Sequence, residues 1–371
     1  MYPGNKTLST WSGVALSTCS AYVSVKAMGV KLGDIIPEKA VEKIKLEDLT
    51  GKAVAFDAYN ILYQFITVIR GPDGRPLMDH MGRITSHLSG VFFRTINFMK
   101  AGLKPIYVYD GRPPELKRET VERREERRSE AAELYERAMR EGRLEEARKY
   151  AQQAATLDQY IVDSSKRLLQ LMGVPVVQAP SEGEAQAAYL ASRGDAYASA
   201  SQDMDSLLFG SPRLVRNLSI VGRRKLPGRK EYVEVVPEII YLDKLLEELG
   251  ITREQLIDIA ILVGTDYCEG VKGVGPKTAL KLVKQHGSAE AALKNLGKSL
   301  EKSPEEIREA FLKPKVTDDY VVEWREPDYE GVKEMLCGEH DFSEERVEKA
   351  LSELRTAYKR QKGVTSLDAW L

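Results

Sequence analysis

The sequence predicts an α/β fold in which a mostly parallel central sheet is flanked by helices. Residues 52–57 and 105–110 are apolar runs of strand length, and each run ends in an aspartate. A helical pattern of apolar residues follows the first run, and a third strand is expected over 196–201, after a helix that begins near residue 182. Strands that alternate with helices are typical of sheets whose ligands bind at the carboxyl ends of the strands.

Length and composition set the outer limits. A chain of 371 residues forms one large domain or two. The net charge is −1 with 30% charged residues, so any affinity for nucleic acid must come from local patches. Three cysteines without metal-ligand spacing indicate a reducing compartment, and no apolar run approaches the roughly 20 residues of a membrane span. We therefore expect a cytoplasmic protein that does not bind a membrane.

Residues 1–27 differ from the rest of the chain. They are rich in Ser and Thr, sparsely charged and without sustained periodicity, and Lys6 alone makes a weak positive region for a signal peptide. We interpret this segment as a disordered or non-native extension, and we expect the ordered protein to begin at Met28.

Residues 180–210 hold four carboxylates around one expected helix and one expected strand. They are Glu182, Glu184, Asp203 and Asp205. Ser181 is predicted to cap the helix, and the two aspartates follow the carboxyl end of the 196–201 strand. Each piece alone has a simpler explanation, namely a capping box that uses Ser181 and Glu184, or a solvated loop. Together, neighbouring carboxylates repel one another, so they predict a cation such as Mg²⁺ that prefers oxygen ligands.

Three further aspartates extend this cluster. Asp57 and Asp110 end the first two strands, and Asp266 follows a helix expected over 253–263. For either of the first two alone, a helix cap or a turn residue is the alternative interpretation. Because the carboxyl ends of parallel strands meet at one sheet edge, we expect all seven carboxylates to lie together.

Residues 112–173 carry helix-forming residues and dense charge without a strand signal. The pattern predicts two helices that stand off the sheet. A solvated hairpin with internal salt bridges and no partner is the alternative. The densest basic segment follows directly on Asp110, so we favour a cationic arch that contacts phosphates.

The middle of the chain supplies further strands and helices. A strand is expected over 174–178, and residues 214–218 and 232–236 are predicted to be edge strands joined by a basic turn. Residues 237–249 and 253–263 fit helical patterns, and a long last helix is expected over 343–361.

Residues 269–288 form the second informative stretch. A turn containing Gly273 and Gly275 precedes a helix that begins at Pro276, and Lys272 and Lys277 flank the turn. Glycines let backbone N–H groups approach a phosphate at a helix N-terminus, and the lysines add positive charge. The pattern predicts a helix-hairpin-helix element that binds the DNA backbone, and an ordinary corner between two helices is the alternative.

From Met28 onward the chain resembles the flap endonuclease family of XPG/Rad2-like nucleases, in its archaeal form. The matching motifs are AFDAYNILYQF, TSHLSGVFFRT, YVYDGRPPELK, APSEGEAQAAYL, SQDMDSLLFGSP, LVGTDYCEGVKGVGPKTA and CGEHDFSEERV. The resemblance implies a PIN-like fold and a structure-specific 5′ nuclease of DNA replication and base-excision repair. It also implies four parts: an N-terminal extension 1–27, a nuclease core 28–265 with the arch at 112–173, a helical region 266–360 and a clamp-binding tail 361–371.

By the same resemblance, the site holds two Mg²⁺ ions, which Mn²⁺ can replace. Asp57, Asp110, Glu182 and Glu184 would hold the first, and Asp203, Asp205 and Asp266 the second. Lys117 and Arg124 match a basic pair that contacts the scissile phosphate. Tyr63 matches an aromatic residue that stacks on a base, and Thr85 lies in a pocket for a one-nucleotide 3′ flap. The implied substrate is branched DNA with a 5′ flap, and the protein is expected to act as a monomer.

The sequence departs from the family pattern at both ends. The Met-Gly pair that begins family members is Met28-Gly29 here, so we expect Met28 to be the true start or the extension to be removed. The tail residues Leu367, Trp370 and Leu371 lie in a motif that binds a PCNA-type sliding clamp, but Val364 stands where the motif usually begins with Gln, and Leu371 stands at an aromatic position. Clamp binding is therefore expected to be weakened.

Two other functions remain open on the sequence. One is a protein that binds DNA junctions without cutting them, and the other is a related 5′ exonuclease or bubble-cutting nuclease.

Overall fold

A computed structural model of the chain describes residues 30–71, 75–218, 222–225 and 232–368. Its centre is a seven-stranded sheet in the order β1-β9-β6-β5-β2-β3-β4. The strands are β1 (Val41–Lys43), β2 (Ala53–Asp57), β3 (Lys104–Tyr109), β4 (Val176–Gln178), β5 (Ala198–Ala200), β6 (Arg213–Arg216) and β9 (Glu238–Tyr241). The strands β2 to β6 pair in parallel, and β9 runs antiparallel to both of its neighbours. The predicted α/β class and mostly parallel sheet are confirmed.

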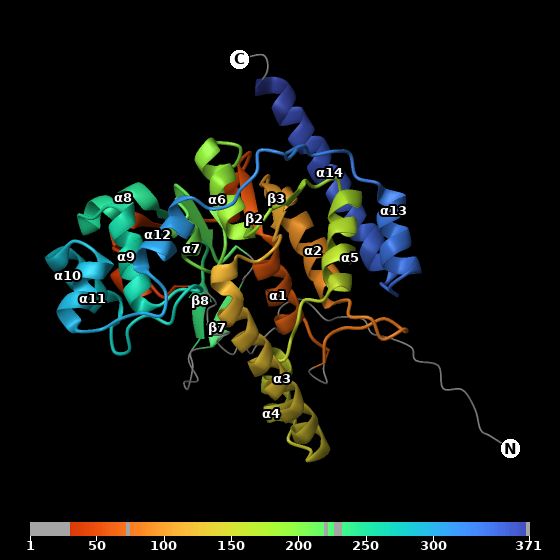
Figure 1. Cartoon of the computed structure of the whole chain (residues 1–371). Helices are drawn as coiled ribbons and strands as arrows, with labels where there is room; N and C mark the ends of the chain where they lie inside the picture. Colours follow the sequence, from red (N-terminus) through yellow and green to blue (C-terminus); the bar gives the residue numbers. More distant parts are fainter. Residues whose placement is uncertain (1–29, 72–74, 219–221, 226–231, 369–371) are drawn as a thin grey trace.

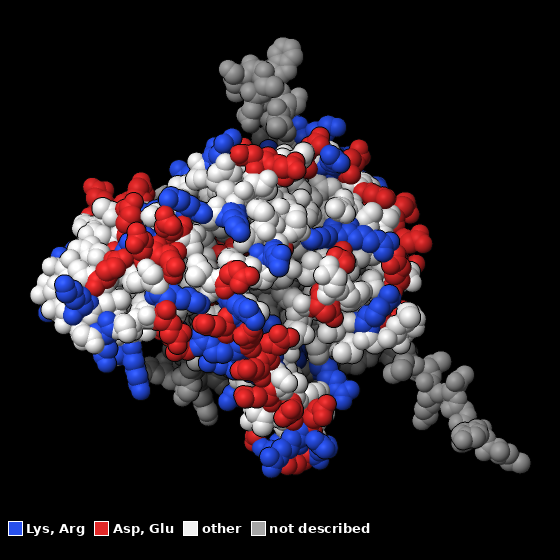
Figure 2. All heavy atoms as spheres, in the orientation of Figure 1, with Lys and Arg blue, Asp and Glu red and all other residues white. Residues whose placement is uncertain are grey.

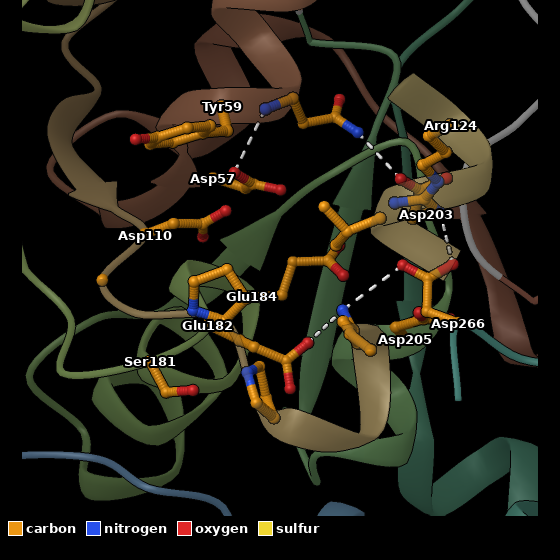
Figure 3. A pocket seen from close by; sticks show the side chains of 16 residues that line it. Asp57, Tyr59, Asp110, Arg124, Ser181, Glu182, Glu184, Asp203, Asp205 and Asp266 are labelled. Carbon is orange, nitrogen blue, oxygen red and sulfur yellow. Dashed lines mark hydrogen bonds and ion pairs between the residues drawn. The ribbon is translucent and has the colours of Figure 1, made fainter. Parts of the chain in front are cut away.

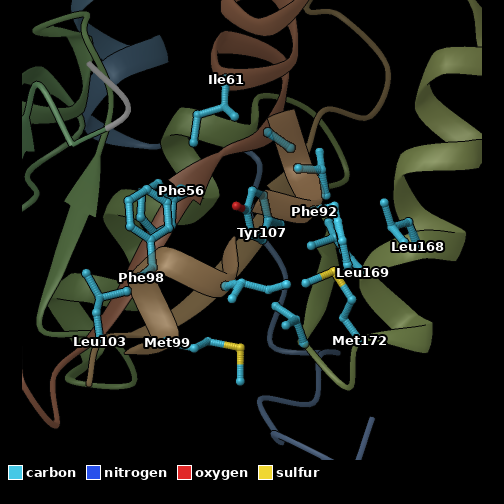
Figure 4. Packing of buried hydrophobic residues seen from close by; sticks show 14 of the residues in the cluster. Phe56, Ile61, Phe92, Phe98, Met99, Leu103, Tyr107, Leu168, Leu169 and Met172 are labelled. Atoms are coloured by element: carbon cyan, nitrogen blue, oxygen red, sulfur yellow. The ribbon is translucent and has the colours of Figure 1, made fainter. Parts of the chain in front are cut away.

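Helices cover both faces of the sheet (Figure 1). Because side chains alternate along a strand, Phe56 and Tyr107 face one layer while Ala55 and Ile106 face the other. The first layer contains α1 (Ala58–Val68), α2 (Ser86–Lys100), α5 (Gln159–Leu171), α13 (Tyr329–Lys333) and α14 (Glu344–Asp368). There the ring of Phe56 stacks on the rings of Phe98 and Tyr107, with centroid distances of 5.0 and 5.5 Å respectively (Figure 4). The second layer is α6 (Gly183–Arg193).

A separate group of helices packs beside the sheet. It contains α7 (Asp205–Leu208), α8 (Leu242–Leu249), α9 (Arg253–Val263), α10 (Pro276–His286), α11 (Ala289–Leu296) and α12 (Pro304–Leu312). Their buried residues form a second core together with the segment 30–40, Ala185 and Ala188 of α6, Leu214 of β6 and Ile240 of β9. Helices α9 and α10 pack together and are joined by a glycine-rich hairpin, so the predicted helix-hairpin-helix is present. Residues 313–328 then cross back to α13 without regular structure.

The helices α3 (Arg118–Arg140) and α4 (Leu144–Gln153) form a hairpin that projects from the body (Figure 1). Gly142 has a φ of +71° at its tip, a conformation that glycine adopts without strain. The next helix within the range assigned to the arch, α5, packs against α2 in the body. The part that stands off the sheet is therefore residues 118–153.

Three local predictions are wrong. The strand at 214–216 lies inside the sheet between β5 and β9, and is not an edge. The predicted strand over 232–236 is present as β8 (Tyr232–Val235), but part of the supposed basic turn before it is itself a strand, β7 (Gly222–Lys225), and is the partner of β8 in the described residues. The 237–249 helix is shorter than expected, because Ile239 and Ile240 are buried in β9 and the helix α8 begins only at Leu242.

Some of the predictions fall on the two ends of the chain. The extension 1–27 lies outside the described residues, as do Trp370 and Leu371. The backbone of Leu367 is helical and forms part of α14, which extends past the expected end at residue 361. No helix in the described ranges combines the length and apolar character that crossing a bilayer needs.

Candidate active site

All seven predicted carboxylates line one pocket at the carboxyl edge of the parallel strands (Figure 3). They come from β2, the end of β3, the start of α6, the turn after β5, the start of α7 and the loop after α9. Lys117 and Arg124 at the base of the α3–α4 hairpin line the same pocket. Residues separated by more than two hundred positions are thus brought to one place by the parallel sheet.

Asp57 and Asp110 lie at the ends of two paired strands. The Asp57 carboxylate caps α1 by accepting a hydrogen bond from the Asn60 amide at 3.1 Å. Asp110 accepts one from the Gly183 amide at 2.6 Å. A Cβ atom on Gly183 would lie 2.7 Å from the Asp110 carboxylate, so this position requires glycine. The sequence interpretation missed Gly183, although its place between two glutamates was visible.

Glu182 and Glu184 flank this glycine at the start of α6. The predicted Ser181 cap is wrong: Glu182 is the N-cap, and the Ser181 hydroxyl donates to the Arg112 carbonyl at 3.2 Å. Glu184 accepts from the Ser201 hydroxyl at 2.6 Å, so it does not form a capping box with Ser181. The helix therefore presents both glutamates to the pocket.

Asp203 and Asp205 are held by neighbours that the sequence interpretation did not single out. The Asn60 side-chain amide donates to Asp203 at 2.9 Å, and the Val30 backbone amide donates to Asp205 at 2.9 Å. Both aspartates are buried. Asn60 lies in the first turn of α1, the helix that Asp57 caps. Its backbone amide binds Asp57 at the end of β2, and its side chain binds Asp203 after β5, so one residue holds carboxylates from two strand ends.

Asp266 is bound by the two basic residues of the hairpin. Arg124 Nη2 lies 2.5 Å from Asp266 Oδ1, and Lys117 Nζ lies 3.3 Å from Asp266 Oδ2 (Figure 3). Lys117 also forms an ion pair with Glu182. Burial alone would raise the pKa of Asp266, but the two cations outweigh it and leave that pKa lowered. Burial likewise opposes the charge on Lys117, and Glu182 and Asp266 nevertheless raise its pKa.

The other carboxylates carry an excess of negative charge. Burial and then the charge of Asp110 raise the pKa of Asp57 to about 7. Burial also raises the pKa of Asp110 and of Asp205 to about 6 each. The pKa values of Glu184 and Asp203 are raised by burial and then by the charge of Asp205. Groups in this condition are stabilised by a cation placed among them.

The donor set fits hard divalent cations, because seven carboxylates supply only oxygen ligands. In the described residues, however, no three acidic, His or Cys side chains converge closely enough to hold an ion as they stand. Lys117 and Arg124 instead neutralise one side of the pocket. The division of the carboxylates between two ions stays a prediction.

The residues predicted to bind DNA lie outside this pocket. Tyr63 on α1 is partly buried, with the Arg128 guanidinium 5.8 Å from the centre of its ring. Thr85 is buried just before α2. Lys272, Gly273, Gly275 and Lys277 are exposed on the hairpin between α9 and α10.

Comparison with known proteins accounts for this arrangement. The XPG N-terminal domain model matches residues 28–131, and the XPG I-region model matches residues 173–266. Flap endonuclease 1 of Ignicoccus hospitalis is 58% identical over 335 residues, which cover 90% of this chain and 96% of the relative. Flap endonuclease 1 of Pyrococcus furiosus is 55% identical over 344 residues, which cover 92% and 99%.

Solved structures agree with the sequence matches. The flap endonuclease-1 from Methanococcus jannaschii is 43% identical with a TM-score of 0.70, and the match covers 90% of this chain and 100% of that chain. The catalytic core of Rad2 in complex with a DNA substrate shares the fold, with a TM-score of 0.67 at 23% identity over 88% of this chain and 99% of that one. The resemblance inferred from the motifs is confirmed: the chain belongs to the flap endonuclease family.

Proposed function

We propose that this protein is a structure-specific 5′ flap endonuclease, with 5′–3′ exonuclease activity, that acts in Okazaki fragment maturation and base-excision repair. The observation that carries the proposal is the single pocket lined by seven carboxylates, with Lys117 and Arg124 at its rim. Relatives that match end to end are flap endonucleases. Nucleases of this family depend on metal ions, and this pocket supplies the oxygen ligands that such ions require.

In this proposal, Asp57, Asp110, Glu182 and Glu184 would hold one Mg²⁺ ion, and Asp203, Asp205 and Asp266 would hold a second. Mn²⁺ could replace them. Such ions would supply an activated water and positive charge for the leaving oxygen, and hydrolysis would give a 5′-phosphate and a 3′-hydroxyl. The sheet contributes by fixing the carboxylates before substrate arrives.

Lys117 and Arg124 bind the scissile phosphate. In the absence of DNA both are committed to Asp266, and Lys117 also to Glu182. A phosphate that enters the pocket offers them equivalent anionic oxygens, so the same side chains orient the substrate. Tyr63 stacks on the neighbouring base, which places the scissile bond over the carboxylates.

The remaining surfaces bind the rest of the substrate. The α3–α4 hairpin takes the single-stranded 5′ arm, and the hairpin between α9 and α10 binds the duplex backbone through Lys272, Gly273, Gly275 and Lys277. Thr85 contributes to the pocket for a one-nucleotide 3′ flap. The tail with Leu367, Trp370 and Leu371 binds a PCNA-type sliding clamp. We further propose that the protein is a cytoplasmic monomer.

A panel of flap, gapped, nicked and bubble DNA tests this function. The wild-type protein should cut the 5′ flap fastest and release a 5′-phosphate product, with activity lost in chelator. Preference for the nick or the bubble would favour the related exonuclease or bubble-cutting function. Binding of flaps without cleavage in Mg²⁺ or Mn²⁺ would favour a junction-binding protein and contradict the proposal.

A further inference from the structure

Tyr267 is a buried residue whose side chain contacts two residues of the pocket, Glu182 and Lys117. It follows Asp266 directly, and its exposed fraction is 2%. The edge of its ring packs against Phe311 of α12, with centroids 4.9 Å apart. Its backbone amide donates to the Thr265 hydroxyl at 3.0 Å. Both ends of this residue are therefore fixed by the helical body beside the sheet.

The polar end of Tyr267 reaches the carboxylates. Its hydroxyl donates a hydrogen bond to Oε2 of Glu182. The other oxygen of that carboxylate, Oε1, forms the ion pair with Lys117. A carboxylate that is held at one oxygen presents the other in a fixed direction, so the hydroxyl determines where Glu182 meets the lysine.

The ring of Tyr267 contacts the same lysine directly. Lys117 Nζ lies 5.4 Å from the centre of the ring, within the range of a cation–π interaction. The Lys117 side chain is only 16% exposed, and both of its ion-pair partners contact or adjoin Tyr267. One tyrosine thus acts on Lys117 by two routes, through its ring and through Glu182.

We propose that Tyr267 is a positioning residue for Lys117, which it holds at the mouth of the pocket for delivery to the scissile phosphate. The inference rests on the proposed function for what Lys117 does, but the positioning itself is a property of the DNA-free protein. Filling space alone would not need the hydroxyl, because phenylalanine has the same ring.

Two variants separate the two routes. Tyr267→Phe keeps the ring and removes the hydroxyl, whereas Tyr267→Leu removes both. Tyr107→Phe is the matched control, because it removes another buried tyrosine hydroxyl, which bonds to Thr95 at 2.8 Å and does not line the pocket. Thermal unfolding shows whether each variant is folded at the assay temperature. If Tyr267→Leu is not, Tyr267→Phe alone decides the outcome.

The first readout needs neither metal nor DNA. Protein labelled with ¹³C at lysine Cε gives one NMR signal per lysine, and Lys117→Arg assigns the signal of interest. The Lys117 signal should be shifted upfield by the tyrosine ring in the wild type, and it should lose this shift in Tyr267→Leu. A Lys117 signal at the position of exposed lysines in the wild type would overturn the proposal, whether or not the protein cuts flaps.

The second readout is a double-mutant cycle on single-turnover cleavage of a 5′ flap. A hydrogen bond to a charged group is worth roughly tenfold or more, so Tyr267→Phe should slow cleavage by about tenfold while flap binding in Ca²⁺ is unchanged. In a Lys117→Ala background the same change should cost about twofold or less. An equal loss in both backgrounds, or no loss in the wild-type background, would contradict positioning through Lys117.

Discussion

At the scale of single residues, Gly183 shows how closely the pocket is built. Its amide binds Asp110, and a Cβ there would lie 2.7 Å from that carboxylate and 3.1 Å from the Val108 carbonyl. Gly183→Ala should therefore displace the Asp110 side chain and cost about 1–3 kcal/mol of unfolding free energy, because the buried carboxylate must leave the Gly183 amide and the Val108 carbonyl is backbone that cannot move aside. Urea unfolding and single-turnover cleavage of a 5′ flap measure the two effects.

Gly33→Ala is the matched control for this substitution. A Cβ on Gly33 would meet only the end of the Met204 side chain at 3.9 Å, an ordinary contact. Full cleavage activity in Gly183→Ala would show that the position of Asp110 does not matter, and would contradict its role as a ligand.

The raised pKa values predict how stability depends on pH. Asp57 with a pKa of about 7, and Asp110 and Asp205 with pKa values of about 6, retain protons in the folded protein that the unfolded chain releases near pH 4. At these sites the folded state thus binds more protons, so their contribution to the free energy of unfolding should fall as pH rises from about 4 to 7, against the opposite contribution of buried His87, whose pKa is lowered to about 3. Thermal melts in chelator at several pH values measure this effect.

Divalent cation should reverse that trend. Ca²⁺ binds the ionised carboxylates, so its stabilising effect should grow as pH rises over the same range. Asp57→Asn should change the pH dependence in chelator, because it removes a buried carboxyl whose pKa is raised to about 7. Stability in chelator that depends on pH in the same way in the wild type and in Asp57→Asn would show that the carboxylates are not crowded as described.

At the scale of elements, the base of α3 is tied to the helical body that carries the predicted duplex-binding hairpin. Lys302, just before α12, donates to the Leu116 carbonyl at 2.8 Å and pairs with Glu119 at 3.3 Å. Arg123 pairs with Glu269 in the loop between α9 and α10. The segment that carries Lys117 and Arg124 is thus held by contacts with the same helical body that carries the predicted duplex-binding hairpin.

Lys302→Met should loosen this connection. It keeps most of the aliphatic stem but leaves the Leu116 carbonyl without its donor, at a local cost of about 1–3 kcal/mol. Amide hydrogen exchange of residues 117–124 should accelerate several-fold. Lys313→Met, which breaks an exposed pair with Glu309 at the end of α12, should leave that exchange unchanged. Equal exchange in the two variants would mean that Lys302 does not hold the hairpin base.

Elements with local signals were predicted well, and elements set by distant pairing were not. The helix α9 has the predicted bounds because Thr252 and Gln255 form a capping box and Gly264 ends it. The strand β9 was missed because its pairing with β1 and β6 is not local, and the leucine-rich segment after it extends a helical pattern backward. The interior position of β6 depends on the same pairing.

At the scale of the whole molecule, charge is mixed and not segregated. Figure 2 shows acidic and basic side chains interleaved over the visible face, including the projecting hairpin. Because the net charge is −1, DNA binding must depend on a few lysine and arginine side chains at particular positions.

Lys277→Gln should weaken flap binding and reduce the slope of log affinity against log salt by about 0.9, because one phosphate contact is lost. Binding titrations in Ca²⁺ at four salt concentrations measure the slope.

Lys298→Gln serves as the control for charge alone, since Lys298 is exposed just after α11 and is not part of the loop between α9 and α10. The slope should stay at the wild-type value there. Equal changes in the two variants would point to a general effect of net charge, and would contradict duplex binding by the hairpin.

The gathering of carboxylates from residue 57 to residue 266 could be predicted, because strand ends of a parallel sheet meet at one edge. The partners of those carboxylates could not. Asn60, Ser201, Gly183 and Tyr267 act through side-chain or backbone contacts that span 17 to 143 positions, and no periodic pattern marks them. The pairing of Asp266 with Lys117 and Arg124 likewise depends on where the hairpin base lies.

The most direct test of the account asks whether carboxylates from separate elements act as one site. Single-turnover cleavage of a 5′ flap in Mg²⁺ should be compared for wild type, Asp57→Asn, Asp203→Asn and Asp266→Asn, with flap binding measured in Ca²⁺. All three variants should lose about a hundredfold or more in rate while they still bind the flap. A variant that binds and cuts at the wild-type rate would show that its carboxylate lies outside the catalytic site, and would contradict the account.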